Sequence, residues 1–181
     1  RTNGYISHIT ALQVDSDRAN PDLTSRAYSG VRSRDPVMAA GTHFKKALGA
    51  RAASATLEVA VTPDQAILAA SVQSQPMSVW LDHALKYSDN TETEMIARHA
   101  LRINRMETTF KNIQPLMVRV MKEYGVDASK LVMADGSGLA QSNRVTARMT
   151  AELMTRYTNG IPERRRAVLA LNMAGGGGFE I

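Results

Sequence analysis

A serine, an aspartate and an asparagine stand side by side at Ser88-Asp89-Asn90, between two segments with helical periodicity. A serine hydroxyl can donate and accept a proton, and an asparagine side chain offers both a carbonyl oxygen and an NH₂ group. Groups of these types can take part in acid–base chemistry or bind a polar ligand. The same residue types are also frequent at helix joints, where they cap free backbone groups. Taken alone, the tripeptide favours capping and leaves catalysis open.

A second group of residues has the composition of a tight turn. Residues Asp135-Gly136-Ser137-Gly138 form a predicted turn, because two glycines in four residues supply the positive φ angles that tight turns require.

Helices and short strands must position these residues. Helical periodicity, with Asp35 and Thr146 as N-caps and a capping box of Thr91 with Glu94, predicts helices over 35–48, 76–87, 91–103, 113–124 and 146–157. Alternating or β-branched runs predict strands over 5–12, 55–61, 66–70, 130–134 and 167–173. Helices outnumber strands and the two are mixed along the chain, so the expected fold class is α/β or α+β.

Both groups occur in segments that resemble one protein family. The run 81–90, followed by Glu94-Met95, resembles the segment of low-molecular-mass penicillin-binding proteins in which a helix delivers an S-x-N motif to the active site. The stretch 134–139, followed by Asn143-Arg144-Val145-Thr146, resembles the D-G-S-G-L…N-R-V-T segment of class C D-alanyl-D-alanine carboxypeptidases that also act as endopeptidases. The motifs occur in the order of that family, and the resemblance covers roughly residues 30–158.

The resemblance implies a fold and a site. The fold would be the core of serine β-lactamases and penicillin-binding proteins, an antiparallel sheet flanked by helices, here incomplete. Residues 1–30 would be the end of a domain that the family inserts, and 31–181 a partial carboxypeptidase-like domain. Ser88 would relay a proton to the departing amine and Asn90 would bind the substrate amide, without a cofactor. The turn of Asp135, Gly136, Ser137 and Gly138 would shape the wall of the substrate cleft, and a direct catalytic role of this turn is the less favoured alternative.

The resemblance also implies partners and a location. The parent protein would cleave the D-Ala-D-Ala bond of peptidoglycan stem peptides, and peptide cross-links, through a serine acyl-enzyme. β-Lactams would acylate the same serine. The protein would act outside the cytoplasm, in the periplasm or cell envelope.

The sequence lacks two motifs of that family. No serine has a lysine three positions later, and neither K-T-G nor H-T-G occurs. Without a nucleophile beside a proton acceptor, these residues alone should not hydrolyse a peptide. Two alternatives therefore stay open: a shortened, non-catalytic relative that binds envelope peptides, and an unrelated helical binding module. The second predicts that Ser88 and the Asp135 turn lie far apart.

Composition excludes several other classes of function. The 181 residues contain no cysteine, so disulfides and thiolate metal sites are absent. The four histidines lack metal-ligand spacing, and we expect no metal. The net charge is +5, but the basic residues are scattered apart from Arg164-Arg165-Arg166 and aromatic residues are few, so we expect no nucleic-acid partner.

The sequence contains no recognisable membrane span or export signal. No run approaches the ~20 apolar residues of a membrane span. The sequence opens at Arg1 without an initiator Met or a signal peptide, as a processed or truncated chain does. The low-complexity tail Gly175–Gly178 has no assigned role.

Overall fold

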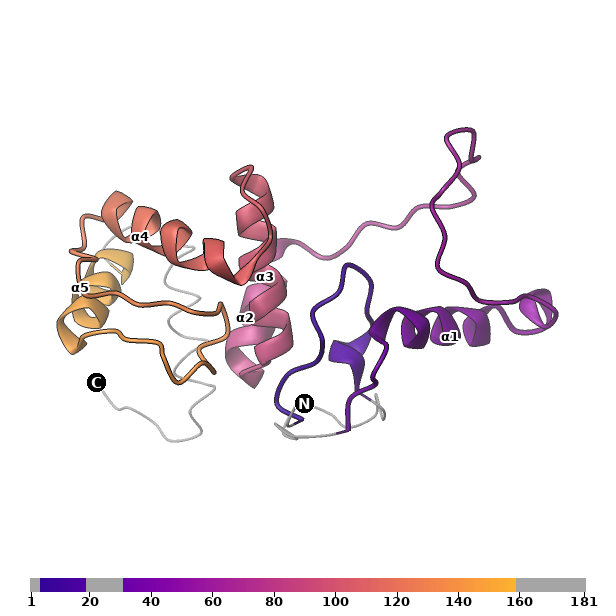
Figure 1. The fold of residues 1–181 in the computed structure, drawn as a ribbon, viewed down its shortest axis with the longest axis horizontal. Helices are drawn as coiled ribbons and strands as arrows, with labels where there is room; N and C mark the ends of the chain where they lie inside the picture. The colour runs from indigo at the N-terminus through magenta and orange to yellow at the C-terminus, as the bar shows by residue number, and fades with distance from the viewer. Residues whose placement is uncertain (1–3, 19–30, 159–181) are drawn as a thin grey trace. The chain divides into compact units, whose positions relative to one another are not determined.

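The computed structural model describes residues 4–18 and 31–158 (Figure 1). The chain divides into two compact units, Arg1–Met77 and Ser78–Ile181, which are described separately. The predicted strand 167–173, the arginine run 164–166 and the glycine tail lie outside the described residues.

The first unit is built around one helix, α1 (Pro36–Leu48). The helix begins as predicted, because an Asp35 carboxylate oxygen accepts a hydrogen bond from the Met38 N–H at 3.1 Å. It ends at Gly49, whose φ of 58° suits a residue without a Cβ. Two 3₁₀ turns, η1 (Asp15–Asp17) and η2 (Gly49–Ala52), complete the regular structure that is described in this unit.

The strands predicted in this unit are wrong as far as the described residues show. Segments 5–12, 55–61 and 66–70 form no strand, and the last two have no regular secondary structure. Val61 and Ile67 are each 93% exposed. A strand exists only when a neighbour exchanges backbone hydrogen bonds with it, and no described residue supplies that neighbour. The β-branched pattern therefore stays without a sheet.

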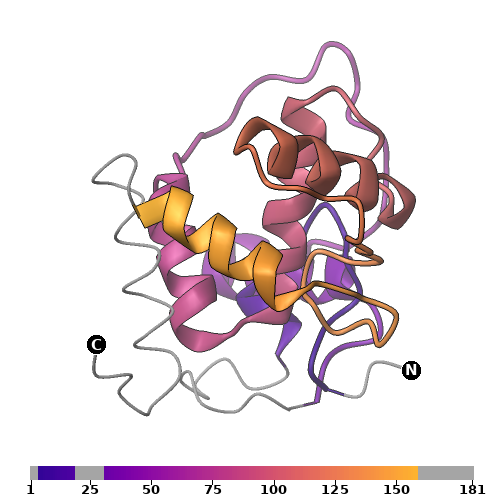
Figure 2. The same ribbon diagram turned by 90° about the vertical axis from the view of Figure 1, so that its left-hand side faces the viewer.

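The second unit contains four α-helices among its described residues: α2 (Met77–Tyr87), α3 (Asn90–Ile103), α4 (Ile113–Glu123) and α5 (Ala147–Thr158) (Figure 2). A 3₁₀ turn, η3 (Phe110–Asn112), leads into α4. All four helices were predicted to within one or two residues at each end. Periodicity located them well because each buries one face.

One predicted helix cap is wrong. The N-cap of α3 is Asp89, whose Oδ1 accepts a hydrogen bond from the Glu92 N–H at 3.1 Å, and not Thr91, which lies fully buried in the first turn. The expected capping box does not form because the Glu94 carboxylate has partners elsewhere.

Two hydrophobic clusters form the core of the second unit. Leu101 of α3 packs with Ile113 and Leu116 of α4, while Met121 of α4 and Met149 of α5 pack with loop residues. The partly buried Met117 and Met133 pack against both clusters, as expected for methionines that fill a core.

The predicted strand 130–134 is reduced to a single isolated bridge. Val132 and Arg144 exchange two backbone hydrogen bonds of 2.8 and 2.9 Å. The described part of the chain is therefore helical with little strand, and the antiparallel sheet of the expected core is not seen in it.

Candidate active site

Ser88-Asp89-Asn90 forms the joint between α2 and α3. The Asp89 N–H donates a 3.0 Å hydrogen bond to the Ala84 carbonyl, which closes α2. Ser88 is exposed and has a φ of 53°, a left-handed conformation that costs a residue with a Cβ about 1–2 kcal/mol. Strain of this kind is often found at functional sites. Asn90 then opens α3.

The three residues of the joint have different environments. Asp89 is buried and caps the helix, so this residue fits the capping interpretation. The Ser88 hydroxyl has no hydrogen-bond partner among residues 4–18 and 31–158, so it is available to a ligand. The structure therefore separates a capping residue from an exposed hydroxyl within one motif.

The predicted turn is organised around the buried carboxylate of Asp135. Its Oδ1 accepts hydrogen bonds from the Gly138 N–H at 3.0 Å and the Asn143 side chain at 2.7 Å, and its Oδ2 from the Ala140 N–H at 2.8 Å and the Ser137 hydroxyl at 3.1 Å. Burial alone would raise the pKa of Asp135, but these four hydrogen bonds together hold that pKa below its ordinary value. Asp135 therefore acts as an ionised hub that shapes the turn.

The two positions in the turn require glycine for different structural reasons. Gly138 has a φ of 84°, as the sequence predicted, whereas Gly136 does not have a positive φ. Gly136 is needed because a Cβ there would lie 2.4 Å from the Cβ of Ala97 in α3. The second positive φ in the prediction was wrong, and close packing on the helix is the reason for the glycine.

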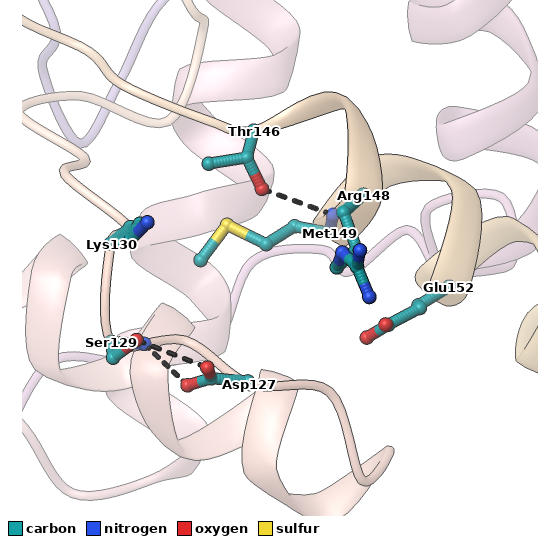
Figure 3. Close-up of a pocket in the computed structure, with 7 residues that line it drawn as sticks. All are labelled: Asp127, Ser129, Lys130, Thr146, Arg148, Met149 and Glu152. Atoms are coloured by element: carbon teal, nitrogen blue, oxygen red, sulfur yellow. Dashed lines mark hydrogen bonds between the residues drawn. The ribbon is translucent and has the colours of Figure 1, made fainter.

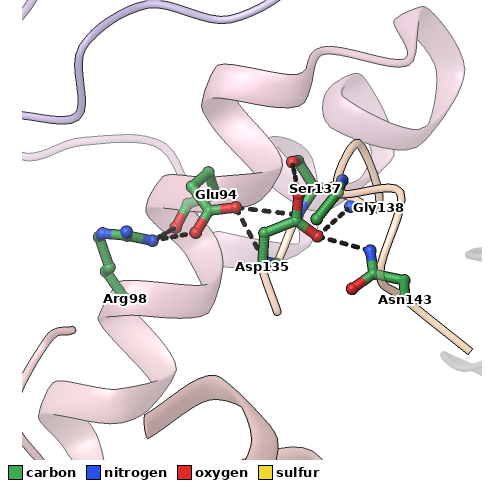
Figure 4. A network of polar contacts seen from close by, with 8 residues as sticks. Glu94, Arg98, Asp135, Ser137, Gly138 and Asn143 are labelled. Carbon is green, nitrogen blue, oxygen red and sulfur yellow. Dashed lines mark hydrogen bonds and ion pairs between the residues drawn. The ribbon is translucent and has the colours of Figure 1, made fainter. Parts of the chain in front are cut away.

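The Glu94 side chain joins this turn to α3 (Figure 4). Its Oε2 accepts hydrogen bonds from the N–H groups of Gly136 and Ser137 at 2.8 and 2.9 Å. Its Oε1 is paired with Arg98, one helical turn further along. The structure thus brings the turn against the same helix that Ser88-Asp89-Asn90 begins, although the two motifs are more than forty residues apart in the sequence.

Sequence reasoning missed two of the residues that build this arrangement. The sequence pattern predicts a capping box for Glu94 and gives no signal at Arg98. Asn143 belonged to a recognised motif, and the structure gives it a purpose: its Oδ1 accepts from the Ala134 N–H at 2.7 Å while its NH₂ donates to Asp135. No sequence signal reports contacts of this range, because they depend on how the loop returns to the helix.

A separate pocket of about 190 Å³ lies beside the first turns of α5 (Figure 3). Acidic and basic side chains both line it, with the Asp127 carboxylate already accepting hydrogen bonds from the Ser129 N–H and hydroxyl at 2.9 and 3.1 Å. The Ser129 N–H is the main cause that lowers the pKa of Asp127. None of the residues that line this pocket was predicted as a site residue. Its lining residues are Asp127, Ser129, Lys130, Thr146, Arg148, Met149 and Glu152.

The described ranges contain neither a cluster of metal ligands nor a helix that could span a membrane. Within residues 4–18 and 31–158, no three His, Asp or Glu side chains gather as metal ligands would. No described helix has both the length and the apolar composition to cross a bilayer.

Comparison with known proteins identifies relatives over almost the whole chain. The model of the "D-Ala-D-Ala carboxypeptidase 3 (S13) family" matches residues 18–180. Carboxypeptidase Rv3627c of Mycobacterium tuberculosis is 33% identical over 178 residues, which are 97% of this chain and 37% of that protein. Carboxypeptidase DacB of Mycolicibacterium smegmatis is 28% identical over 176 residues, again 97% of this chain and 37% of that protein. The chain thus spans little more than a third of the length of these relatives. No solved structure matches it.

Proposed function

Because this chain belongs to the D-Ala-D-Ala carboxypeptidase 3 (S13) family, we propose that it is part of a serine D-Ala-D-Ala carboxypeptidase and endopeptidase. The parent protein trims or cleaves peptidoglycan stem peptides through an acyl-enzyme, and β-lactams acylate the same serine. Family membership also removes the alternative of an unrelated helical module.

One observation carries the assignment of the site. Ser88 is exposed, in a left-handed conformation, at the start of the helix that also holds the Asp135 turn. A hydroxyl presented in this way can pass a proton to a leaving amine. Asn90 follows on the first turn of α3, where its carboxamide can bind a peptide group of the substrate.

The nucleophile of the proposed reaction has to come from elsewhere. The 181 residues contain no Ser-x-x-Lys, and the chain covers 37% of each relative. We propose that the acylated serine, its lysine and the strand that receives the substrate carboxylate lie in other segments of the parent protein. In the reaction, the serine oxygen forms an ester with the penultimate D-alanine carbonyl, the amide bond breaks, and the terminal D-alanine leaves with a proton passed through Ser88.

A location outside the cytoplasm follows from the proposed substrate. Peptidoglycan stem peptides are cross-linked in the cell envelope, so an enzyme that trims them has to be exported. Fractionation of cells that express the native gene should recover the protein with the envelope or periplasm, and recovery in the cytoplasm alone would contradict this proposal.

Intact mass spectrometry of the complete gene product with a β-lactam tests the proposed chemistry. We expect a gain of one drug mass on the serine of a Ser-x-x-Lys motif, in which the lysine stands three positions after the serine. Ser88→Ala should slow adduct formation by about 10²–10⁴-fold, the usual contribution of a general acid or base. Ser142→Ala, also an exposed serine in the second unit, should acylate at the wild-type rate.

The outcomes separate the two surviving functions. A complete product that gains no drug mass but binds stem peptides would favour a non-catalytic relative. Acylation of Ser88→Ala at the wild-type rate would leave the enzyme assignment intact and remove Ser88 from the mechanism.

A further inference from the structure

We propose that Glu94 is a positioning residue for the S-D-N motif, which fixes the Asp135 turn beside the face of α3 that carries Asn90. The inference rests on the proposed function, since it concerns the same site. It starts from a fully buried carboxylate, one oxygen of which binds the turn while the other is paired with Arg98 of the same helix.

Helix geometry places Glu94 one turn after Asn90 on the same face of α3. Residues four apart in an α-helix lie on the same face, and residues three apart are neighbours on it. Asn90, Glu94 and Ala97 therefore form one stripe along α3. Glu94 binds two N–H groups of the turn, and Ala97 meets the turn at Gly136, so the turn lies along this stripe.

The second carboxylate oxygen of Glu94, Oε1, is also fixed by a partner. Arg98, only 13% exposed, pairs with Oε1 and also contacts the Glu94 backbone carbonyl at 3.3 Å. The Arg98 guanidinium lies 4.3 Å from the centroid of the Phe110 ring in η3, a cation–π distance. A buried carboxylate needs its partners to offset the loss of water, so the group has little freedom to turn.

Chemistry gives this fixation a purpose. A catalytic group that is misplaced by about 1 Å can lose roughly 10²-fold in rate. If Glu94 is removed, the N–H groups of Gly136 and Ser137 lose their acceptor, and the turn can drift from the helix that presents Ser88 and Asn90. Rate should then fall in a folded protein.

The test measures the β-lactam acylation rate of the complete gene product together with hydrogen exchange of the peptide that covers Gly136 and Ser137. Glu94→Ala should acylate about 10–100-fold more slowly and should exchange these amides faster. Glu94→Gln retains one acceptor oxygen and should recover part of both, because the amide group can still face the turn.

A matched control separates positioning from stability. Met121→Ala removes a buried side chain from α4, in the hydrophobic cluster that does not include Ala97, and should lower stability without slowing acylation more than about twofold. If Glu94→Ala does not fold, the comparison of Glu94→Gln with Met121→Ala answers the same question. Loss of rate in proportion to stability in both variants would overturn the proposal.

Failure of the proposed function looks different. An unmodified wild-type protein would contradict the enzyme assignment itself. A wild type that acylates normally, beside Glu94 variants with the same rate, would leave that assignment intact and refute the role of Glu94.

Discussion

Replacing Gly136 by alanine should push the Asp135 turn off α3. The new Cβ would lie 2.4 Å from the Cβ of Ala97, and the two must separate by about 1 Å to reach 3.4 Å, the lower edge of ordinary contact. Neither atom can rotate away, because both are bonded directly to backbone. The turn therefore has to move.

The movement has a definite cost. The Glu94 hydrogen bonds of 2.8 and 2.9 Å would lengthen beyond bonding distance if the turn shifted by that amount. Hydrogen bonds to a charged group contribute about 1.5–3 kcal/mol, and overpacking costs about 1–3 kcal/mol. The protein can relieve the clash by moving the turn, by overpacking the contact, or by a mixture of both, and it adopts the arrangement of lowest free energy. We therefore expect Gly136→Ala to lower the local unfolding free energy by about 2–3 kcal/mol.

Native-state hydrogen exchange of the complete gene product, read on the peptide covering 131–144, measures this loss. Ala97→Gly should cost about 1 kcal/mol alone, because glycine weakens a helix. In the Gly136→Ala background the same change should restore stability, since it removes the clashing Cβ.

Gly138→Ala is the matched control. No atom lies within 4 Å of its added Cβ, and its φ of 84° makes the cost purely one of backbone strain. Ala97→Gly should not rescue it. The reasoning is refuted if Ala97→Gly fails to rescue Gly136→Ala, or rescues both glycine variants alike.

Two further predictions concern other polar contacts of the second unit. The folded pKa of Asp135 is lower than its unfolded pKa of 3.8, so its contribution to stability is present above pH 3.8 and is lost as the pH falls through the folded pKa. Asp135→Asn should therefore be less stable than wild type at pH 7, and the difference between their denaturation midpoints should shrink toward pH 2. A difference that stays constant with pH would contradict this prediction. The Gln114 side chain donates to the Leu131 carbonyl at 2.8 Å and accepts from the Met133 N–H at 2.5 Å, so Gln114→Leu should cost about 2–4 kcal/mol in urea unfolding. Gln114→Glu keeps an acceptor for the Met133 N–H but turns its second oxygen toward the Leu131 carbonyl, so it should also unfold at a lower urea concentration; a wild-type midpoint in both variants would contradict the role of Gln114.

The helices of the second unit could be predicted from the sequence because their signals are local. A helix end is decided by the cap, the glycine stop and the next few apolar positions, as at Asp35, Gly49 and Thr146. The strands could not be predicted in the same way. An alternating run such as 55–61 records a preference for a sheet, but the hydrogen bonds that make a strand come from another segment.

The sequence by itself determined the family and the residues of its S-D-N and D-G-S-G motifs, because these are short, ordered patterns of residue type. Only the tertiary structure decided what joins them. The position of Glu94 would allow it to complete a local capping box, yet its carboxylate binds backbone N–H groups more than forty residues away. Gly136 has to be a glycine because any Cβ there would clash with the Cβ of Ala97. Contacts of that kind depend on the path of the chain between the two motifs, and residue types along the sequence do not encode that path directly.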